Sequence, residues 1–76
     1  MHTVLILDSD APLPAELREV IQAGSTSLQQ IGRDAPRIPM ADRVLVWRGH
    51  ELQLGDRGMR WPEDADEIRM VLQTGG

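Results

Sequence analysis

The segment Thr3-Val4-Leu5-Ile6-Leu7-Asp8 decides the fold class of this chain. It is an apolar run without polar alternation, which is the pattern of a strand buried on both faces of a sheet. A second run, Val44-Leu45-Val46-Trp47, has the same character. Two such runs predict a central pair of parallel strands joined by a right-handed crossover.

The segment that follows the first run predicts an amphipathic helix. Pro12 and Pro14 cannot continue a strand ladder, but they suit the first turn of a helix. Gly24 can serve as the C-cap. Apolar residues recur at helical spacing between these limits, at Leu13, Leu17, Val20 and Ile21.

Residues 25–31 have two possible structures. Their side chains alternate as in an edge strand, but Ser27 and Gln30 also fit a capping box before a short helix. We favour the strand, because a strand–helix–strand unit is the expected use of the preceding helix. The segment from Gly32 to Asp42 contains two prolines and is predicted to be a loop.

The last third of the chain predicts a hairpin and a helix. Residues 51–54 and 59–61 alternate around Gly55-Asp56-Arg57-Gly58, and a four-residue loop would pair Leu54 with Met59 and Leu52 with Trp61. Pro62 and the acidic residues after it predict a helix over residues 63–73, with Gly75 as its cap.

These elements together predict a single small α/β domain over residues 1–76. We expect a sheet of three to five strands, with helices on at least one face and a C-terminal helix closing the fold. The expected core is Val4, Ile6, Leu17, Ile21, Val44, Val46, Leu54 and Leu72.

The composition argues against several classes of function. The net charge is −4 and the pI is about 4.9, whereas nucleic-acid binding usually needs a basic domain. No apolar run approaches the roughly 20 residues of a membrane span. All eight basic residues are arginine. Cysteine is absent, so thiol chemistry and thiolate metal sites are excluded. We expect a cytoplasmic protein.

No catalytic or cofactor motif can be assembled from the sequence. It contains no phosphate-binding loop and no Ser/His/Asp order, and the spacing of His2, His50, Glu51 and Asp56 matches no metal site. We therefore expect neither an enzyme nor a cofactor. Tryptophan and arginine are enriched at interfaces, which favours the hairpin as a contact surface for a protein partner or a homo-oligomer. The expected interface residues are Leu52, Leu54, Met59, Trp61, Arg57 and Arg60.

Two family resemblances bear on these expectations. Residues 3–47 resemble the first half of a response-regulator receiver domain, in which acids after the first strand hold Mg²⁺. Asp8 and Asp10 match that acid cluster, but Trp47 stands where receivers have the phosphorylated aspartate, so strand-end and helix-cap roles are expected for the two acids.

The end of the chain, Gln73-Thr74-Gly75-Gly76, resembles the tail of SUMO and other ubiquitin-like modifiers. This resemblance implies an alternative function as a modifier or sulfur carrier. An activating enzyme would then be the partner, and Gly75 and Gly76 would form the conjugation site.

Overall fold

The two apolar runs form neighbouring parallel strands at the centre of a five-stranded sheet. The computed structural model describes residues 1–74. Strand β1 (His2–Leu7) pairs in parallel with β3 (Arg43–Trp47), so that Leu5 lies beside Leu45. The predicted central pair is confirmed, as is the α/β fold class with its C-terminal helix.

The remaining strands extend the sheet on both sides of this pair. Strand β2 (Ser27–Gly32) runs parallel to β1 at one edge, which confirms the predicted edge strand. Strands β4 (Glu51–Leu54) and β5 (Arg57–Arg60) form the predicted hairpin, with β4 antiparallel to β3. The strand order is β2-β1-β3-β4-β5.

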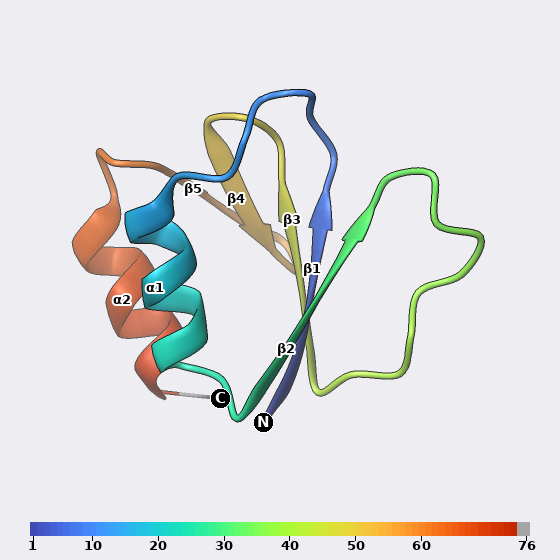
Figure 1. The fold of residues 1–76 in the computed structure, drawn as a ribbon. Coiled ribbons are helices and arrows are strands. Elements are labelled where there is room, and N and C mark those ends of the chain that lie inside the picture. The colour runs from blue at the N-terminus through green and yellow to red at the C-terminus, as the bar shows by residue number, and fades with distance from the viewer. Residues whose placement is uncertain (75–76) are drawn as a thin grey trace.

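The two helices lie on the same face of the sheet, and a loop lies on the other (Figure 1). Helix α1 (Ala15–Ala23) connects β1 to β2, and α2 (Ala65–Thr74) follows β5. The chain then returns from β2 past β1 to β3 through residues 33–42. Because crossovers between parallel strands are right-handed, two that lead in opposite directions along a sheet pass over opposite faces. The second crossover contains Pro36 and Pro39 and has no helix.

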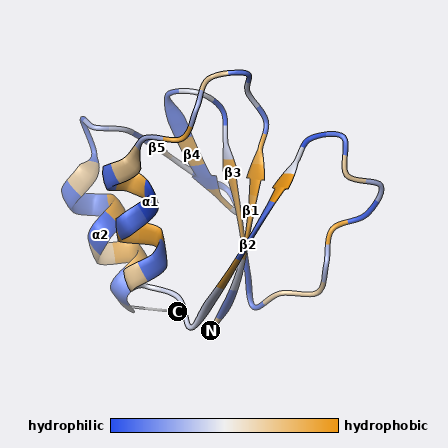
Figure 2. Cartoon of the chain, in the orientation of Figure 1, coloured by the Kyte–Doolittle hydropathy of each residue, from blue (hydrophilic) through white to orange (hydrophobic). Residues whose placement is uncertain are grey.

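The core lies between the helices and one face of the sheet. Figure 2 shows hydrophobic residues along the central strands and hydrophobic stripes on both helices. The fully buried side chains include Leu5, Leu45 and Trp47, which point to the helix side. Of the predicted core, Val4, Leu17, Ile21 and Leu72 are buried, but Ile6, Val44, Val46 and Leu54 are only partly so. The prediction is wrong for Ile6, Val44 and Val46, which lie on the face away from the helices, because a run apolar on both faces does not show which face the helices cover.

The hairpin register differs from the predicted one by two residues. Leu52 pairs with Met59 and Leu54 with Arg57, so the turn is the two residues Gly55-Asp56 and not a four-residue loop. Gly55 has φ +59°, and a glycine at positive φ in the first central position is typical of a type II′ hairpin turn. The tighter turn keeps the same side chains on each face, because a shift of two residues preserves the alternation.

The C-terminal helix begins later than predicted. Residues 61–64 form a turn, and the helix starts at Ala65. Asp64 precedes the helix: its backbone carbonyl accepts a bond from Ile68 N–H, and its carboxylate accepts one from Arg60 N–H. The Trp61–Pro62 peptide bond is cis. The expected cap at Gly75 lies outside the described residues.

Gly24 allows the C-terminal ends of the two helices to approach each other. It is the C-cap of α1, and a Cβ atom at this position would lie 2.7 Å from the carbonyl oxygen of Leu72 in α2. That oxygen belongs to the backbone, so a rotamer change could not relieve the contact. The absence of a side chain at Gly24 therefore sets the closest approach of α1 to α2.

Replacing Gly24 by alanine should separate the two helices. We expect Gly24→Ala to lower the free energy of unfolding by roughly 2 kcal/mol, as overpacking usually does. The measurement is urea denaturation followed by tryptophan fluorescence. Gly32→Ala is the matched control, because nothing lies within 4 Å of a Cβ atom added there. Equal stabilities of the two variants would contradict the steric role of Gly24.

Candidate interaction surface

The hairpin residues expected to form an interface are mostly part of the core. Leu52 and Met59 are fully buried and Trp61 is 7% exposed, and all three pack in the cluster beneath the helices. Leu54 is half-buried, and only Arg57 and Arg60 are exposed. The structure therefore corrects the prediction, because the apolar face of the hairpin is the face that the core covers.

Apolar surface is found instead on the opposite face of the sheet, which we call the open face. The cross-strand neighbours Ile6, Ile31 and Val46 lie on it together with Val44, and all four are only partly buried. The largest apolar side chains of the loop of residues 33–42 nevertheless remain exposed. Ile38 is 55% exposed and Met40 is 95% exposed.

A groove of about 960 Å³ runs from the open face past the β4–β5 turn to α2. Val44 and Val46 contribute apolar lining on β3, and Met70 on α2 is 66% exposed at its far end. Arg48 and Arg57 are exposed beside this lining. The full lining is Met1, Asp42, Arg43, Val44, Val46, Arg48, Gln53, Leu54, Gly55, Arg57, Met70 and Val71.

The charges in the groove are mainly positive, although the chain as a whole is acidic. No side-chain hydrogen bond or ion pair engages Arg48 or Arg57 among residues 1–74. The one acid of the lining, Asp42, is occupied, because its Oδ2 accepts a bond of 2.8 Å from the backbone N–H of His2. The groove can therefore offer two guanidinium groups to carboxylates.

Arg43 forms the buried base of the groove. It is 7% exposed, and its guanidinium donates to Gly24 O at 2.8 Å, Leu72 O at 3.2 Å and the hydroxyl oxygens of Thr3 and Ser25. No carboxylate pairs with it among the described residues. Burial lowers the pKa of Arg43 below its ordinary value. Two main-chain carbonyls and two hydroxyls thus compensate the buried charge.

Removing the Arg43 guanidinium should leave these acceptors without a donor. We expect Arg43→Met to lower the free energy of unfolding by roughly 3 kcal/mol. The loss should be smaller for Arg43→Lys, which keeps the charge but not the planar set of guanidinium donors. Chemical denaturation measures both values. Arg37→Met, in the exposed loop, should change stability by less than about 0.5 kcal/mol. A loss of unfolding free energy in Arg43→Met no larger than that in Arg37→Met would show that the hydrogen bonds of Arg43 do not stabilise the fold.

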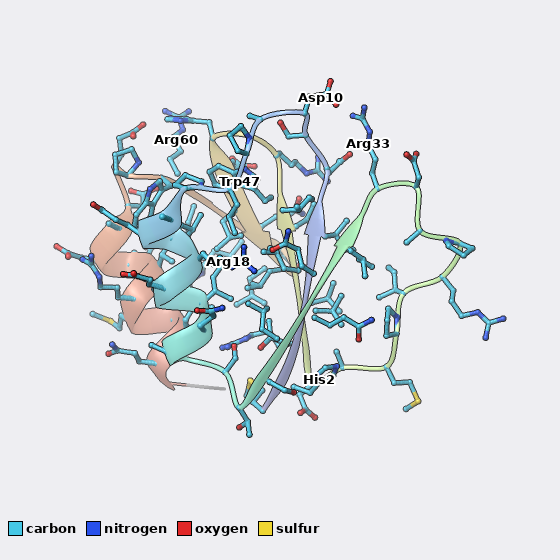
Figure 3. All side chains as sticks on the ribbon, viewed as in Figure 1. His2, Asp10, Arg18, Arg33, Trp47 and Arg60 are labelled. Atoms are coloured by element: carbon cyan, nitrogen blue, oxygen red, sulfur yellow. The ribbon has the colours of Figure 1, made fainter. Side chains whose placement is uncertain are left out.

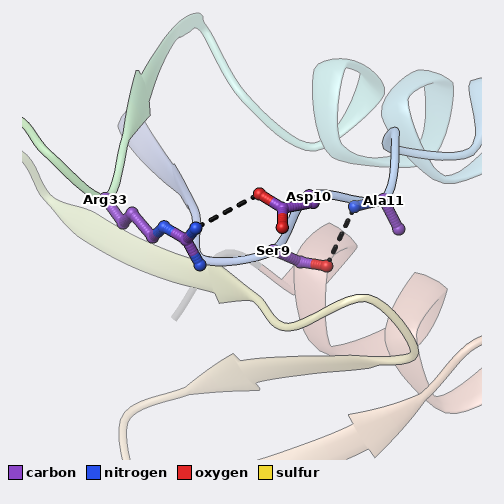
Figure 4. A network of polar contacts seen from close by, with 4 residues as sticks. All are labelled: Ser9, Asp10, Ala11 and Arg33. Carbon is purple, nitrogen blue, oxygen red and sulfur yellow. Dashed lines mark hydrogen bonds and ion pairs between the residues drawn. The ribbon is translucent and has the colours of Figure 1, made fainter.

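The acids that suggested a receiver-like site follow the C-terminal end of β1, and Figures 3 and 4 show Asp10 beside Arg33. Asp10 forms an exposed ion pair of 3.2 Å with Arg33, and Ser9 Oγ accepts a bond from Ala11 N–H at 3.1 Å. Neither aspartate caps α1, whose N-cap is Pro14 without a side-chain bond, so the expected helix-cap role is wrong. Among residues 1–74, no group of three His, Asp or Glu side chains could hold a metal ion.

His50 and Glu63 form an exposed pair near this end. His50 Nε2 lies 2.8 Å from Glu63 Oε2. This hydrogen bond, followed by one from the backbone, holds the pKa of Glu63 below its ordinary value of 4.5. Because the pKa is depressed in the folded state, the pair stabilises the fold fully above pH 4.5. Its contribution is lost as the pH falls through the lowered pKa.

The pair can be tested by titration. In His50→Ala, the pKa of Glu63 should rise toward 4.5, because the carboxylate loses its strongest partner. An NMR titration of the Glu63 side-chain carboxyl measures the shift. His2→Ala removes the other histidine and should leave the Glu63 pKa unchanged. An unchanged Glu63 pKa in His50→Ala would show that the contact does not exist in solution.

Comparisons with known proteins supply no relative to extend this description. No protein-family model, no curated protein and no solved structure matches the chain. Neither helix described in the structure is long and apolar enough to cross a membrane. The conjugation site suggested by the tail resemblance, Gly75 and Gly76, lies beyond the last described residue.

Sequence reasoning missed most of the groove. Arg57 was expected at an interface, but Val44 and Val46 were assigned to the core. The connection between β2 and β3 was the sequence feature that could have indicated this surface. A connection from β2 to β3 containing Pro36 and Pro39 cannot supply the helix that usually covers the second face of a parallel pair.

Proposed function

We propose that the chain is a non-enzymatic protein-interaction module that binds through the groove that runs from its open face to α2. The observation that carries the proposal is an accessible apolar lining, Val44 and Val46, flanked by the unpaired guanidinium groups of Arg48 and Arg57. Apolar contact supplies affinity, and arginine supplies orientation through its planar set of donors.

The chemistry of the groove selects an acidic partner. Two exposed arginines attract carboxylates, and the valine lining favours apolar side chains between them. The groove follows β3 and β4, so an extended segment that alternates acidic and apolar residues fits both features. The partner we propose is thus a protein segment of this composition, not nucleic acid, because the phosphate backbone of nucleic acid offers no apolar side chains.

A pair of synthetic peptides tests the proposed partner. A peptide of alternating leucine and glutamate should bind, and one of alternating leucine and lysine should not. Fluorescence anisotropy of labelled peptide measures both, and the affinity of the acidic peptide should fall as salt rises. If both peptides bind equally, or neither binds, the proposed function is contradicted.

Charge reversal in the groove should remove this binding. We expect Arg48→Glu combined with Arg57→Glu to weaken binding of the acidic peptide by about tenfold, since each lost ion pair contributes up to about 1 kcal/mol. The matched control, Arg18→Glu with Arg37→Glu, makes the same change of net charge away from the groove. An equal loss in the control would mean that only net charge matters.

A further inference from the structure

Strand β2 leaves one edge of the sheet without a partner. It pairs with β1 on one side only, as the first strand in the order β2-β1-β3-β4-β5. In Figure 1, β2 crosses in front of β1, and no other part of residues 1–74 lies across its outer side. The strand has six residues, Ser27-Leu28-Gln29-Gln30-Ile31-Gly32, and contains neither a charge nor a proline.

The other edge of the sheet is protected. Strand β5 has four residues, and the exposed Arg57 and Arg60 stand at its two ends. Charged side chains and short length are the usual devices that prevent an edge strand from pairing with another chain. Strand β2 has neither device, so only this edge is open to a further strand.

The hydrogen bonds of β1 indicate which backbone groups of β2 face outward. On the side of β3, His2 O accepts a bond from Asp42 N–H, and Asp8 N–H donates to Trp47 O. The groups of the odd-numbered residues of β1 therefore point toward β2, where Met1 O accepts from Ser27 N–H at 3.4 Å and from the preceding Thr26 at 2.8 Å. Since orientation alternates along a strand, Gln29 and Ile31 face β1 in the same way as Ser27. Leu28, Gln30 and Gly32 consequently present their N–H and C=O groups to the free edge.

We propose that two copies of the chain pair antiparallel through β2. A two-fold axis perpendicular to the sheet keeps each side chain on its own face, and centring it on Gln30 uses all three outward-facing residues. Gln30 then lies opposite Gln30 of the partner subunit, and Leu28 lies opposite Gly32 of the partner subunit. On the open face, Gln29 lies opposite Ile31 of the partner subunit.

This register avoids side-chain conflict at the junction. Leu28 meets a glycine, and the two Gln30 amides can donate to and accept from one another across the axis. The resulting sheet is continuous through both copies, with all helices on one side and both open faces on the other. The dimer does not depend on what the groove binds, and it would display two grooves on a common face.

Placing opposite charges at Gln30 in two variants tests both the dimer and the position of its two-fold axis. Because like charges directly opposite each other are destabilising, Gln30→Glu and Gln30→Lys should each raise the dimer dissociation constant by about fivefold. An equimolar mixture of the two variants should recover association at least as strong as that of the unmodified chain. Sedimentation velocity over a concentration series measures all three samples. Gln22→Glu and Gln22→Lys, on the exposed side of α1, are matched controls that should leave the constant unchanged.

Single-cysteine variants give a second measurement, since the chain has no cysteine of its own. Gln30→Cys should form a disulfide-linked dimer under mild oxidation, and Asp56→Cys, in the turn beside the protected edge, should not. A monomeric unmodified chain at every concentration, or failure of the charge mixture to restore association, would overturn the proposal. Equal cross-linking at both positions would also overturn it. Because no peptide is involved, none of these results depends on the proposed function of the groove.

Discussion

One buried cation holds the two layers of this protein together. Arg43 extends from the first position of β3 and donates to Gly24 O at the end of α1 and to Leu72 O in the last turn of α2. The C-terminal end of a helix carries partial negative charge, and a basic residue in its last turn usually offsets it. Neither helix has such a residue, so the sheet supplies one guanidinium to both. The arrangement requires both ends to meet at one point, which the missing side chain of Gly24 permits.

This bracing places both helices on one side of a sheet whose centre is apolar on both sides. Parallel strands are normally covered on both faces, because their crossovers carry helices to each. Here the crossover over the second face is a proline-containing loop with outward-facing Ile38 and Met40. Val4 is nevertheless fully buried, whereas Val44 and Val46 remain partly accessible. The open face thus results from a crossover that contains no helix.

The sequence predicted the positions of the helices and strands better than the packing and register between them. The runs Val4–Leu7 and Val44–Trp47 identify central strands, and the spacing of Leu17 and Ile21 identifies a helix, because these patterns are local. The covered face could not be derived, since it depends on which crossover carries a helix. The hairpin register depended on the conformation of Gly55, and the predicted four-residue loop was equally compatible with the alternation. The role of Arg43 was hidden, because its acceptors are backbone carbonyls of distant residues.

The distribution of charge restricts how the molecule can associate. The first turns of α1 and α2 carry Glu16, Asp66 and Glu67, of which Asp66 forms an ion pair with Arg69. Arginines protect the β5 edge, and the uncharged β2 edge and the arginine-lined groove are left available. A further strand can form backbone hydrogen bonds with the β2 edge without burying charge. A segment that carries carboxylates can pair with the arginines of the groove. The helices braced by Arg43 cover one face of the sheet, and the surfaces that we propose for association are the groove that begins on the opposite face and the β2 edge.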